Sequence, residues 1–188
     1  MKIRASLFII ALLTVSELCG QNTDNCVTTT ILSSYSERTY TNVAVTDQQL
    51  EIILRCGIKA PSGNNRQPWK FTVIKDDATM REVIKDVVAG NVLIIISGAQ
   101  SQNGTAPDLF ACGLATQSMF LAAHGLGLGA RIYGGPVSNI NSKKETFQIP
   151  AGYNAVMILR IGNVDKSADA VSAASPRKGF EEVVNYKK

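Results

Sequence analysis

The stretch that decides the fold is residues 60–71, which read A-P-S-G-N-N-R-Q-P-W-K-F. Pro61 and Pro68 exclude a continuous helix here, because proline lacks the backbone N–H and clashes with the preceding turn. Between them lie four turn-forming residues, Ser62-Gly63-Asn64-Asn65, and from Trp69 onward apolar and polar residues alternate. The sequence therefore predicts a polar loop that leads into a half-buried strand.

Polar side chains are unusually dense in this loop. They are Ser62, Asn64, Asn65, Arg66 and Gln67. Because these groups present both hydrogen-bond donors and acceptors, they suit the edge of a flat polar heterocycle. A solvated connection between two elements is the alternative interpretation.

A helix precedes the loop. Thr46 and Gln49 have the spacing of a capping box, in which each side chain bonds the backbone N–H of the other residue. Apolar residues then recur at helical spacing from Leu50 to Ile58, which predicts a helix that ends near Lys59. The loop is thus expected to begin at the C-terminus of a helix.

Alternating and periodic segments predict further elements on both sides. The expected helices are 31–34, 77–88, 108–124, 138–147 and 180–184, and the expected strands are 69–73, 92–96 and 154–161. Strand 92–96 is continuously apolar, so we expect it at the centre of a sheet covered on both faces. Helix 108–124 is apolar on most sides, so it must be buried within the fold or against another subunit.

Residues 125–136 are rich in glycine but contain no G-x-G-x-x-G after a predicted strand, so a Rossmann dinucleotide site is not indicated. Gly134 and Gly135 leave main chain uncovered, which lets a ligand approach the backbone amides closely. His124 is the one histidine of the chain. At a helix C-terminus it is expected to cap carbonyls or to pack, and a role in proton transfer is the alternative.

Composition indicates a globular domain. The chain has 188 residues, of which 45% are hydrophobic and 18% charged, as is usual for one compact domain. The net charge of +4 is modest, and basic residues outside the first twenty form nothing longer than pairs. This distribution does not support a nucleic-acid partner.

The first residues have the pattern of a secretory signal. Lys2 and Arg4 precede the apolar run 5–15, which is too short to span a bilayer. We expect a signal peptide at 1–20, a flexible segment at 21–30, one domain at 31–188 and a periplasmic or secreted location. Lipidation of Cys19 is an alternative to cleavage after Gly20, although Ser16-Glu17-Leu18 is a poor lipidation signal.

After this leader three cysteines remain, Cys26, Cys56 and Cys112, without metal-type spacing. No metal site is expected. Buried inert thiols are the default for Cys56 and Cys112, which lie in predicted apolar helices, and one disulfide in an oxidising compartment is an alternative whose pairing the sequence leaves open.

The loop at 60–71 closely resembles the signature of the nitroreductase family, whose members bind flavin mononucleotide (FMN). The resemblance covers about residues 31–184. It implies an α+β fold, with a central mixed and mostly antiparallel sheet flanked by helices in a three-layer sandwich. In this family the loop lies against the flavin ring and ribityl chain, which implies cofactor contacts for Pro61, Ser62, Gly63, Asn65 and Gln67.

Other motifs resemble the same family. Ser36 and Arg38 are similar to the last part of its R-R-S-x-R segment, which contacts the FMN phosphate and the N1/C2 edge of the ring. Ser34 and Tyr35 replace the two leading arginines, so a phosphate partner is missing. The resemblance further places Gly134 and Gly135 beside the flavin N5 and O4 atoms. It also places Arg177 at the phosphate and Val183-Val184 on a partner subunit's sheet.

The chain departs from the family between residues 88 and 92. Family members usually carry more residues here, and some of these residues form a lid over the flavin. The resemblance therefore implies an abbreviated member with a more open site.

Side-chain catalysis lacks candidates, since the sequence offers no nucleophile with a base and no usefully spaced carboxylates. A bound cofactor must therefore carry any reaction. The resemblance implies an FMN-dependent oxidoreductase, active as a homodimer, that passes electrons by a ping-pong mechanism. The electrons would come from NAD(P)H or another donor and would reduce a nitroaromatic, a quinone or a similar small aromatic acceptor. A non-catalytic exported protein that binds a flavin or another ligand on the same scaffold is the alternative.

Overall fold

The computed structural model describes residues 25–100, 108–168 and 176–187. Four strands form one sheet in the order β1-β2-β4-β3, and every neighbouring pair is antiparallel. They are β1 (Trp69–Ile74), β2 (Val92–Ala99), β3 (Leu128–Tyr133) and β4 (Tyr153–Asn163). A single parallel bridge joins Ser36 to Ala130 at the outer edge of β3.

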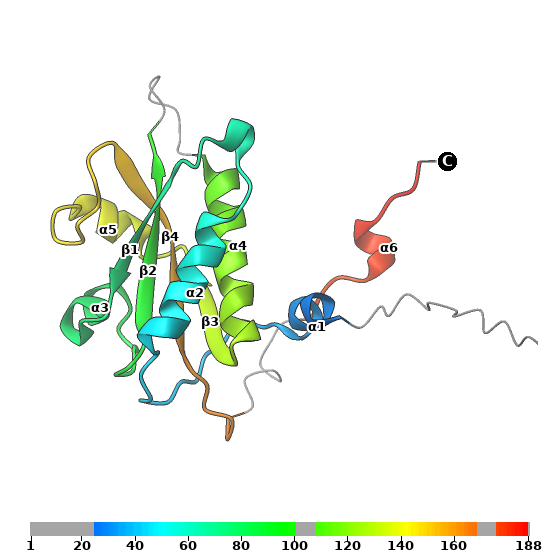
Figure 1. Cartoon of the computed structure of the whole chain (residues 1–188), viewed down its shortest axis with the longest axis horizontal. Coiled ribbons are helices and arrows are strands. Elements are labelled where there is room, and N and C mark those ends of the chain that lie inside the picture. The colour runs from blue at the N-terminus through cyan, green and yellow to red at the C-terminus, as the bar shows by residue number, and fades with distance from the viewer. Residues whose placement is uncertain (1–24, 101–107, 169–175, 188) are drawn as a thin grey trace, which may run out of the picture.

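Helices cover both faces of this sheet (Figure 1). On one face lie α2 (Asp47–Ile58) and α4 (Leu109–Gly125), and on the other α3 (Asp77–Val83) and α5 (Val137–Ser142). The predicted α+β class and three-layer sandwich are confirmed by this arrangement.

Two short helices stand apart from the layers. In Figure 1, α1 (Cys26–Ser33) and α6 (Phe180–Val183) lie beyond α4, on the side away from α3 and α5. Neither contains a buried residue. The expected signal peptide 1–20, with Cys19, lies outside the described residues. Within the described part of the chain, no helix combines the length and apolar character needed to cross a bilayer.

Helices α2 and α4 pack closely because of one glycine. The predicted capping box starts α2, with Gln49 N donating to Thr46 Oγ1 at 3.2 Å and Thr46 N to Gln49 Oε1 at 3.0 Å. Near its end, a methyl group at Gly57 would lie only 2.7 Å from Met119 Cγ on α4. The glycine thus lets α2 approach α4, and α2 in turn positions the loop that follows it.

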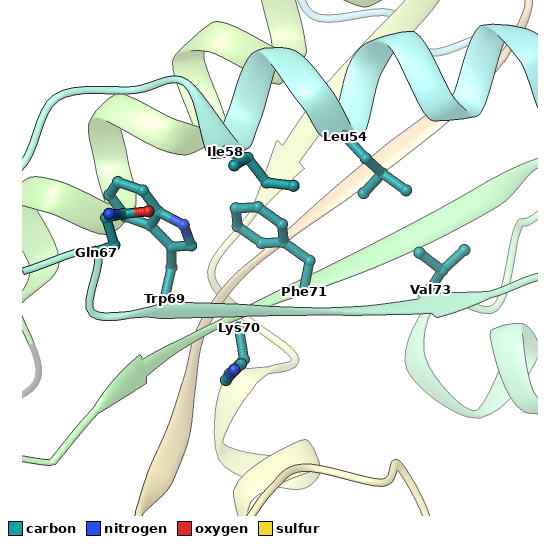
Figure 2. Close-up of a pocket in the computed structure, with 7 residues that line it drawn as sticks. All are labelled: Leu54, Ile58, Gln67, Trp69, Lys70, Phe71 and Val73. Carbon is teal, nitrogen blue, oxygen red and sulfur yellow. The ribbon is translucent and has the colours of Figure 1, made fainter.

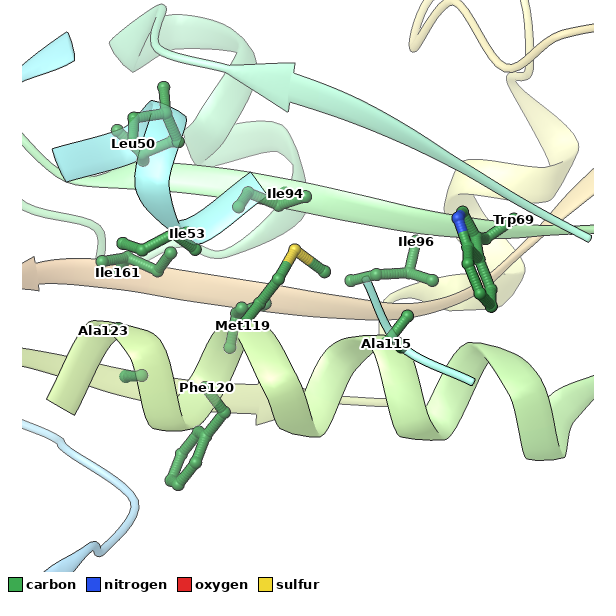
Figure 3. Packing of buried hydrophobic residues seen from close by; sticks show 14 of the residues in the cluster. Leu50, Ile53, Trp69, Ile94, Ile96, Ala115, Met119, Phe120, Ala123 and Ile161 are labelled. Atoms are coloured by element: carbon green, nitrogen blue, oxygen red, sulfur yellow. The ribbon is translucent and has the colours of Figure 1, made fainter. Parts of the chain in front are cut away.

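The larger core lies between these two helices and the sheet (Figure 3). Met119 is fully buried there, close to Ile53 of α2 and Ile94 of β2. Residues 93–96 of β2 are likewise fully buried between β1 and β4. The expectation that strand 92–96 is central and covered on both faces is therefore confirmed.

The predicted helix at 77–88 is too long, because α3 ends at Val83 and Ile84 is extended with φ −134° and ψ 112°. The cause is Arg160 of β4, which is only 1% exposed. Its guanidinium donates to the carbonyl of Asp86 at 2.9 Å and to Asn91 Oδ1 at 2.8 Å. The chain therefore turns around this buried cation instead of continuing its helix.

Other boundaries also differ from prediction. The first helix was expected at 31–34 but begins at Cys26, inside the segment 21–30 that was expected to be flexible, because Asn25 caps its N-terminus. The helix expected at 138–147 is confined to Val137–Ser142. Strand β3 was not predicted.

Candidate functional site

Ser36 and Arg38 lie in an extended segment beside the outer edge of β3. The segment is attached there by the backbone bond from Glu37 N to Ala130 O, at 3.0 Å. Ser36 and Arg38 are exposed, whereas Glu37 between them is fully buried. This alternation agrees with the expectation that Ser36 and Arg38 project to one side.

Glu37 organises this segment, although the sequence did not single it out. Its Oε1 accepts hydrogen bonds from Arg38 N at 2.7 Å, Thr39 N at 2.8 Å and Thr39 Oγ1 at 3.1 Å, and its Oε2 accepts one from Tyr35 Oη at 3.0 Å. Gly129 on β3 leaves the space for this side chain. One sequence signal could have identified Glu37: in an extended segment its side chain must point inward, because its neighbours Ser36 and Arg38 point outward. The second signal, Gly129 opposite Glu37, was lost because strand β3 was not predicted.

The loop at 61–67 is shaped by its own hydrogen bonds. Gln67 N donates to Ser62 Oγ at 2.9 Å, and Asn65 N donates to Ser62 O at 3.0 Å. Asn64, Asn65 and Gln67 have φ angles of 51°, 53° and 47°, in the left-handed region. These bonds hold a conformation that residues other than glycine seldom adopt.

The loop is also held at its C-terminal end. Pro68 O accepts from Ala99 N at 2.7 Å, which ties the loop to the end of β2. Arg66 lies 3.7 Å from Asp108, whose side chain caps α4 by accepting from Ala111 N at 2.9 Å. The polar side chains of the loop are therefore presented from a backbone anchored on two elements.

A groove of about 420 Å³ lies between α2 and β1, directly after the loop (Figure 2). Leu54 and Ile58 of α2 face Phe71 across it, while Gln67 lies at one end beside Trp69. Trp69 and Phe71 are nearly parallel, with an interplanar angle of 5°. Trp69 is only 6% exposed and belongs to the core, which favours the packing role over cofactor stacking.

Gly134 and Gly135 follow β3 directly and are exposed. A methyl group at either position would meet no atom within 4 Å. Their backbone is thus open to a ligand, as expected from the sequence.

The predicted site residues are divided among separate parts of the fold. Ser36, Arg38, Gly134 and Gly135 belong to the β3 side of the sheet, whereas Pro61, Ser62, Gly63, Asn65 and Gln67 precede β1 at the opposite edge. At a strand spacing of about 4.8 Å, these two edges are about 14 Å apart. Arg177 lies in the exposed segment before α6.

His124 lies at the end of α4, with its ring 4.6 Å from Phe120 and 5.8 Å from Tyr35 between centroids. Burial lowers the pKa of His124, although a hydrogen bond with the Tyr35 backbone and the charge of Glu37 oppose that change. Burial, a hydrogen bond to Glu37 and the Glu37 charge together raise the pKa of Tyr35. The position of His124 thus agrees with the packing interpretation.

The described cysteines are all free. Cys112 is buried, and burial raises the pKa of its thiol to about 11, as expected for an inert group. Cys56 is partly exposed and Cys26 exposed, and both border a cavity of about 540 Å³ between α1, α2 and α4. Among the described residues, no three His, Cys, Asp or Glu side chains gather as a metal site.

A family model described as the nitroreductase family matches residues 31–106 and 89–163, which together include most of the chain. The chain belongs to the nitroreductase family.

Two curated relatives, from Archaeoglobus fulgidus and Methanothermobacter thermautotrophicus, are provisionally named as NADH dehydrogenases or NAD(P)H nitroreductases. The first is 29% identical over 108 residues, covering 53% of this chain and 62% of the relative. The second is 31% identical over 103 residues, covering 50% of this chain and 53% of the relative. The matched region thus spans little more than half the length of these relatives.

Among solved structures, a provisionally named nitroreductase from Desulfovibrio desulfuricans in complex with FMN is 29% identical, with a TM-score of 0.73. The match covers 88% of this chain and 99% of that chain. The nitroreductase fold therefore extends over nearly the whole of this protein.

Proposed function

We propose that this nitroreductase is an FMN-dependent oxidoreductase. It would take two electrons from a reduced nicotinamide or another donor and pass them, by a ping-pong mechanism, to a nitroaromatic, a quinone or a similar acceptor. The observation that carries this proposal is the match, over almost the whole chain, to a relative crystallised with FMN. When bound, FMN supplies a redox centre that accepts and releases a hydride.

The residues present fit this cofactor. Exposed Ser36 and Arg38 offer a hydroxyl and a guanidinium on one side of their segment, suited to a phosphate, and Arg177 offers a second guanidinium. The open backbone at Gly134 and Gly135 leaves room for a flat ring to approach its amides. The preformed loop supplies the amide and hydroxyl groups of Ser62, Asn65 and Gln67.

We further propose that each site is completed by a second copy of the chain. The loop and the Ser36 segment lie at opposite edges of the sheet, so two protomers could bring the two groups to one cofactor. Helices α1 and α6, with the residues that follow α6, expose apolar side chains that a partner would cover. They are Val27, Ile31 and Leu32 near the N-terminus, and Phe180, Val183 and Tyr186 near the C-terminus.

The outer edge of β1 is the place where we propose that residues 184–187 of the second copy bind. Strand β1 has a neighbour on one side only within the described sheet, and the apolar groove of Figure 2 lies along its face. An extended segment at 184–187, which follows α6, could pair with such an edge. Light scattering on the full chain and on a variant ending at residue 178 tests this: the full chain should be dimeric, and the truncated variant should dissociate more readily.

We also propose export, from the basic residues Lys2 and Arg4 and the apolar run 5–15. Cell fractionation, with mass spectrometry of the mature N-terminus, checks this proposal and shows whether Cys19 carries a lipid. Because nicotinamide cofactors are scarce outside the cytoplasm, an exported enzyme would use a different electron donor. A stable cytoplasmic protein that keeps residues 1–20 would contradict the proposal.

Flavin binding is the first test of the cofactor. Protein purified with added FMN should be yellow, and Arg38→Gln should weaken FMN binding by about tenfold, as expected for loss of a charge-assisted hydrogen bond. Arg81→Gln is a matched control, because Arg81 is an exposed arginine of α3 that pairs with Asp77. A wild-type protein that stays colourless at high micromolar FMN would refute the proposal.

A non-catalytic flavin-binding protein is the second candidate. The observation that favours it is the replacement of two family arginines by Ser34 and Tyr35, the second of which donates its hydroxyl to Glu37. Oxidation of NADH and NADPH by the FMN-loaded protein, with and without nitrofurazone, separates the two. Turnover that depends on the acceptor supports the enzyme, whereas tight FMN binding without turnover by these or artificial donors supports the binder.

A further inference from the structure

The extended segment that contains Ser36 and Arg38 also contains a buried negative charge, the carboxylate of Glu37. Glu37 has no exposed surface, and it occupies the position between Ser36 and Arg38, the two side chains proposed to hold the flavin phosphate. Its carboxylate accepts four hydrogen bonds, from two backbone N–H groups and two hydroxyl groups. Such a set of donors suits an ionised carboxylate, which only accepts.

No cation among the described residues lies within ion-pair distance of this carboxylate, although the charges of Arg160 and Arg131 act, as that of Glu37 does, on the neighbouring Tyr40. The four hydrogen-bond partners are neutral groups, and none of the ion pairs between described residues includes Glu37. Its field reaches its surroundings, since the charge of Glu37 adds to the burial that raises the pKa of Tyr35 and opposes the burial that lowers the pKa of His124. A second negative group placed beside this segment would therefore be repelled.

We propose that Glu37 weakens the selectivity of this site for phosphorylated flavin, so that the chain binds riboflavin nearly as well as FMN. This inference rests on the proposed flavin site. Riboflavin has the same ring and ribityl chain as FMN but carries no phosphate, so repulsion from Glu37 acts on FMN alone.

The geometry sets the size of the effect. Neighbouring Cα atoms are about 3.8 Å apart, so a phosphate held by the side chains of Ser36 and Arg38 would lie within about one Debye length, roughly 10 Å, of the Glu37 carboxylate. At this distance, with the dielectric response of a protein surface, the repulsion lowers FMN affinity by about three- to thirtyfold. Arg38 and Arg177 attract the phosphate, and Glu37 offsets much of the attraction of one of them.

Glu37→Gln separates charge from shape. The amide oxygen can still accept from Arg38 N and Thr39 N, and the amide NH₂ can donate to the Tyr35 hydroxyl oxygen, so the segment keeps its conformation while the charge is removed. Glu51→Gln is the matched control, because Glu51 is an exposed glutamate of α2 that pairs with Arg55.

The experiment measures the dissociation constants of FMN and riboflavin by fluorescence quenching on the flavin-free full chain, at low and at 0.5 M salt. In the wild type the two constants should differ by less than about tenfold. Glu37→Gln should tighten FMN by about three- to thirtyfold with riboflavin unchanged, and the gain should shrink at high salt. Glu51→Gln should change neither constant by more than twofold.

The failures are distinguishable. If Glu37→Gln weakens both flavins equally, or leaves their ratio within twofold, Glu37 only shapes the segment and the inference is wrong while the flavin site stands. A wild type that already prefers FMN by several hundredfold also overturns the inference. Binding of neither flavin to the wild type overturns the proposed function and this inference with it.

Discussion

Gly129→Ala should destabilise the protein strongly, because residue 129 makes the space for Glu37. A methyl group there would lie 2.5 Å from Glu37 Cγ and 2.9 Å from both Glu37 Cβ and Val164 Cγ2. Carbon atoms in contact are normally about 3.5 to 4.0 Å apart, so each of these contacts is too close by roughly 0.6 Å or more. Overpacking of this kind costs about 1 to 3 kcal/mol.

The hydrogen bonds of Glu37 add to this cost. If the carboxylate moves to relieve the overlap, it leaves Arg38 N, Thr39 N and two hydroxyl groups without their acceptor, and each bond to a charged group is worth about 1.5 to 3 kcal/mol. Loss of one such bond brings the expected destabilisation to about 2.5 to 6 kcal/mol. The smaller unfolded-state entropy of alanine returns less than about 1 kcal/mol.

Urea unfolding, followed through the fluorescence of Trp69, measures this effect. Trp69 is the single tryptophan and is 6% exposed, so its emission reports the loss of the core. Gly113→Ala on α4 is the control, since a methyl group there meets nothing within 4 Å and alanine favours the helix by about 0.5 to 1 kcal/mol. Protein and flavin concentrations are held equal, because association and ligand binding shift apparent stability.

The double variant Gly129→Ala, Glu37→Ala isolates the contact. Removal of the Glu37 side chain beyond Cβ relieves the shortest overlap, so the two changes should be non-additive by at least about 1 kcal/mol. Additive effects, or a Gly129→Ala free energy of unfolding within 0.5 kcal/mol of the wild type, would show that Glu37 is not held against this strand.

Three further predictions concern the elements that carry the site. Met119→Ala should lower the free energy of unfolding by about 2 to 5 kcal/mol in urea titrations, because Met119 is fully buried between α2, α4 and the sheet; a loss below 1 kcal/mol would contradict that packing. Asp108→Ala should cost about 1 kcal/mol through the loss of the α4 cap, again by urea unfolding, whereas Asp77→Ala, which leaves the Asp76 cap of α3 in place, should cost less. Because burial lowers the pKa of His124 below its unfolded value of about 6.5, the unfolded chain binds the proton more readily, and stability should fall as the pH drops from 7.5 to 5.5. In His124→Gln this part of the pH dependence should disappear, and equal slopes for both proteins would refute it.

Local patterns predicted the parts of the fold that depend on local chemistry. The capping box of Thr46 and Gln49 identified the start of α2, and the apolar run at 92–96 identified the central strand. Helix α3 was predicted too long because residues 84 and 87 face the same core as Met80 although the chain has already turned. That turn depends on Arg160, which lies about seventy residues later and gives no local signal.

Strand β3 was missed because the stretch 125–136 was interpreted through its glycines alone, as a possible dinucleotide motif and, at Gly134 and Gly135, as a ligand approach. Leu128, Ala130 and Ile132 alternate with Gly129, Arg131 and Tyr133, which is the period of a strand. The candidate residues themselves were identified by resemblance to a family. Their separation within the fold depends on strand order, which sequence spacing does not determine. The burial of Glu37 depends on strand order as well.

The three left-handed residues of the loop, Asn64, Asn65 and Gln67, also bear on how this protein could be engineered. Glycine adopts such angles without steric cost, so replacing Gln67 by glycine would relieve conformational strain in the native state. The same replacement would remove an amide from the proposed binding loop and widen the range of conformations that the loop can adopt. Selection for thermal stability at this loop would therefore oppose selection for a loop whose conformation is already formed before a ligand binds. Libraries designed to raise the melting temperature should leave these three positions unchanged.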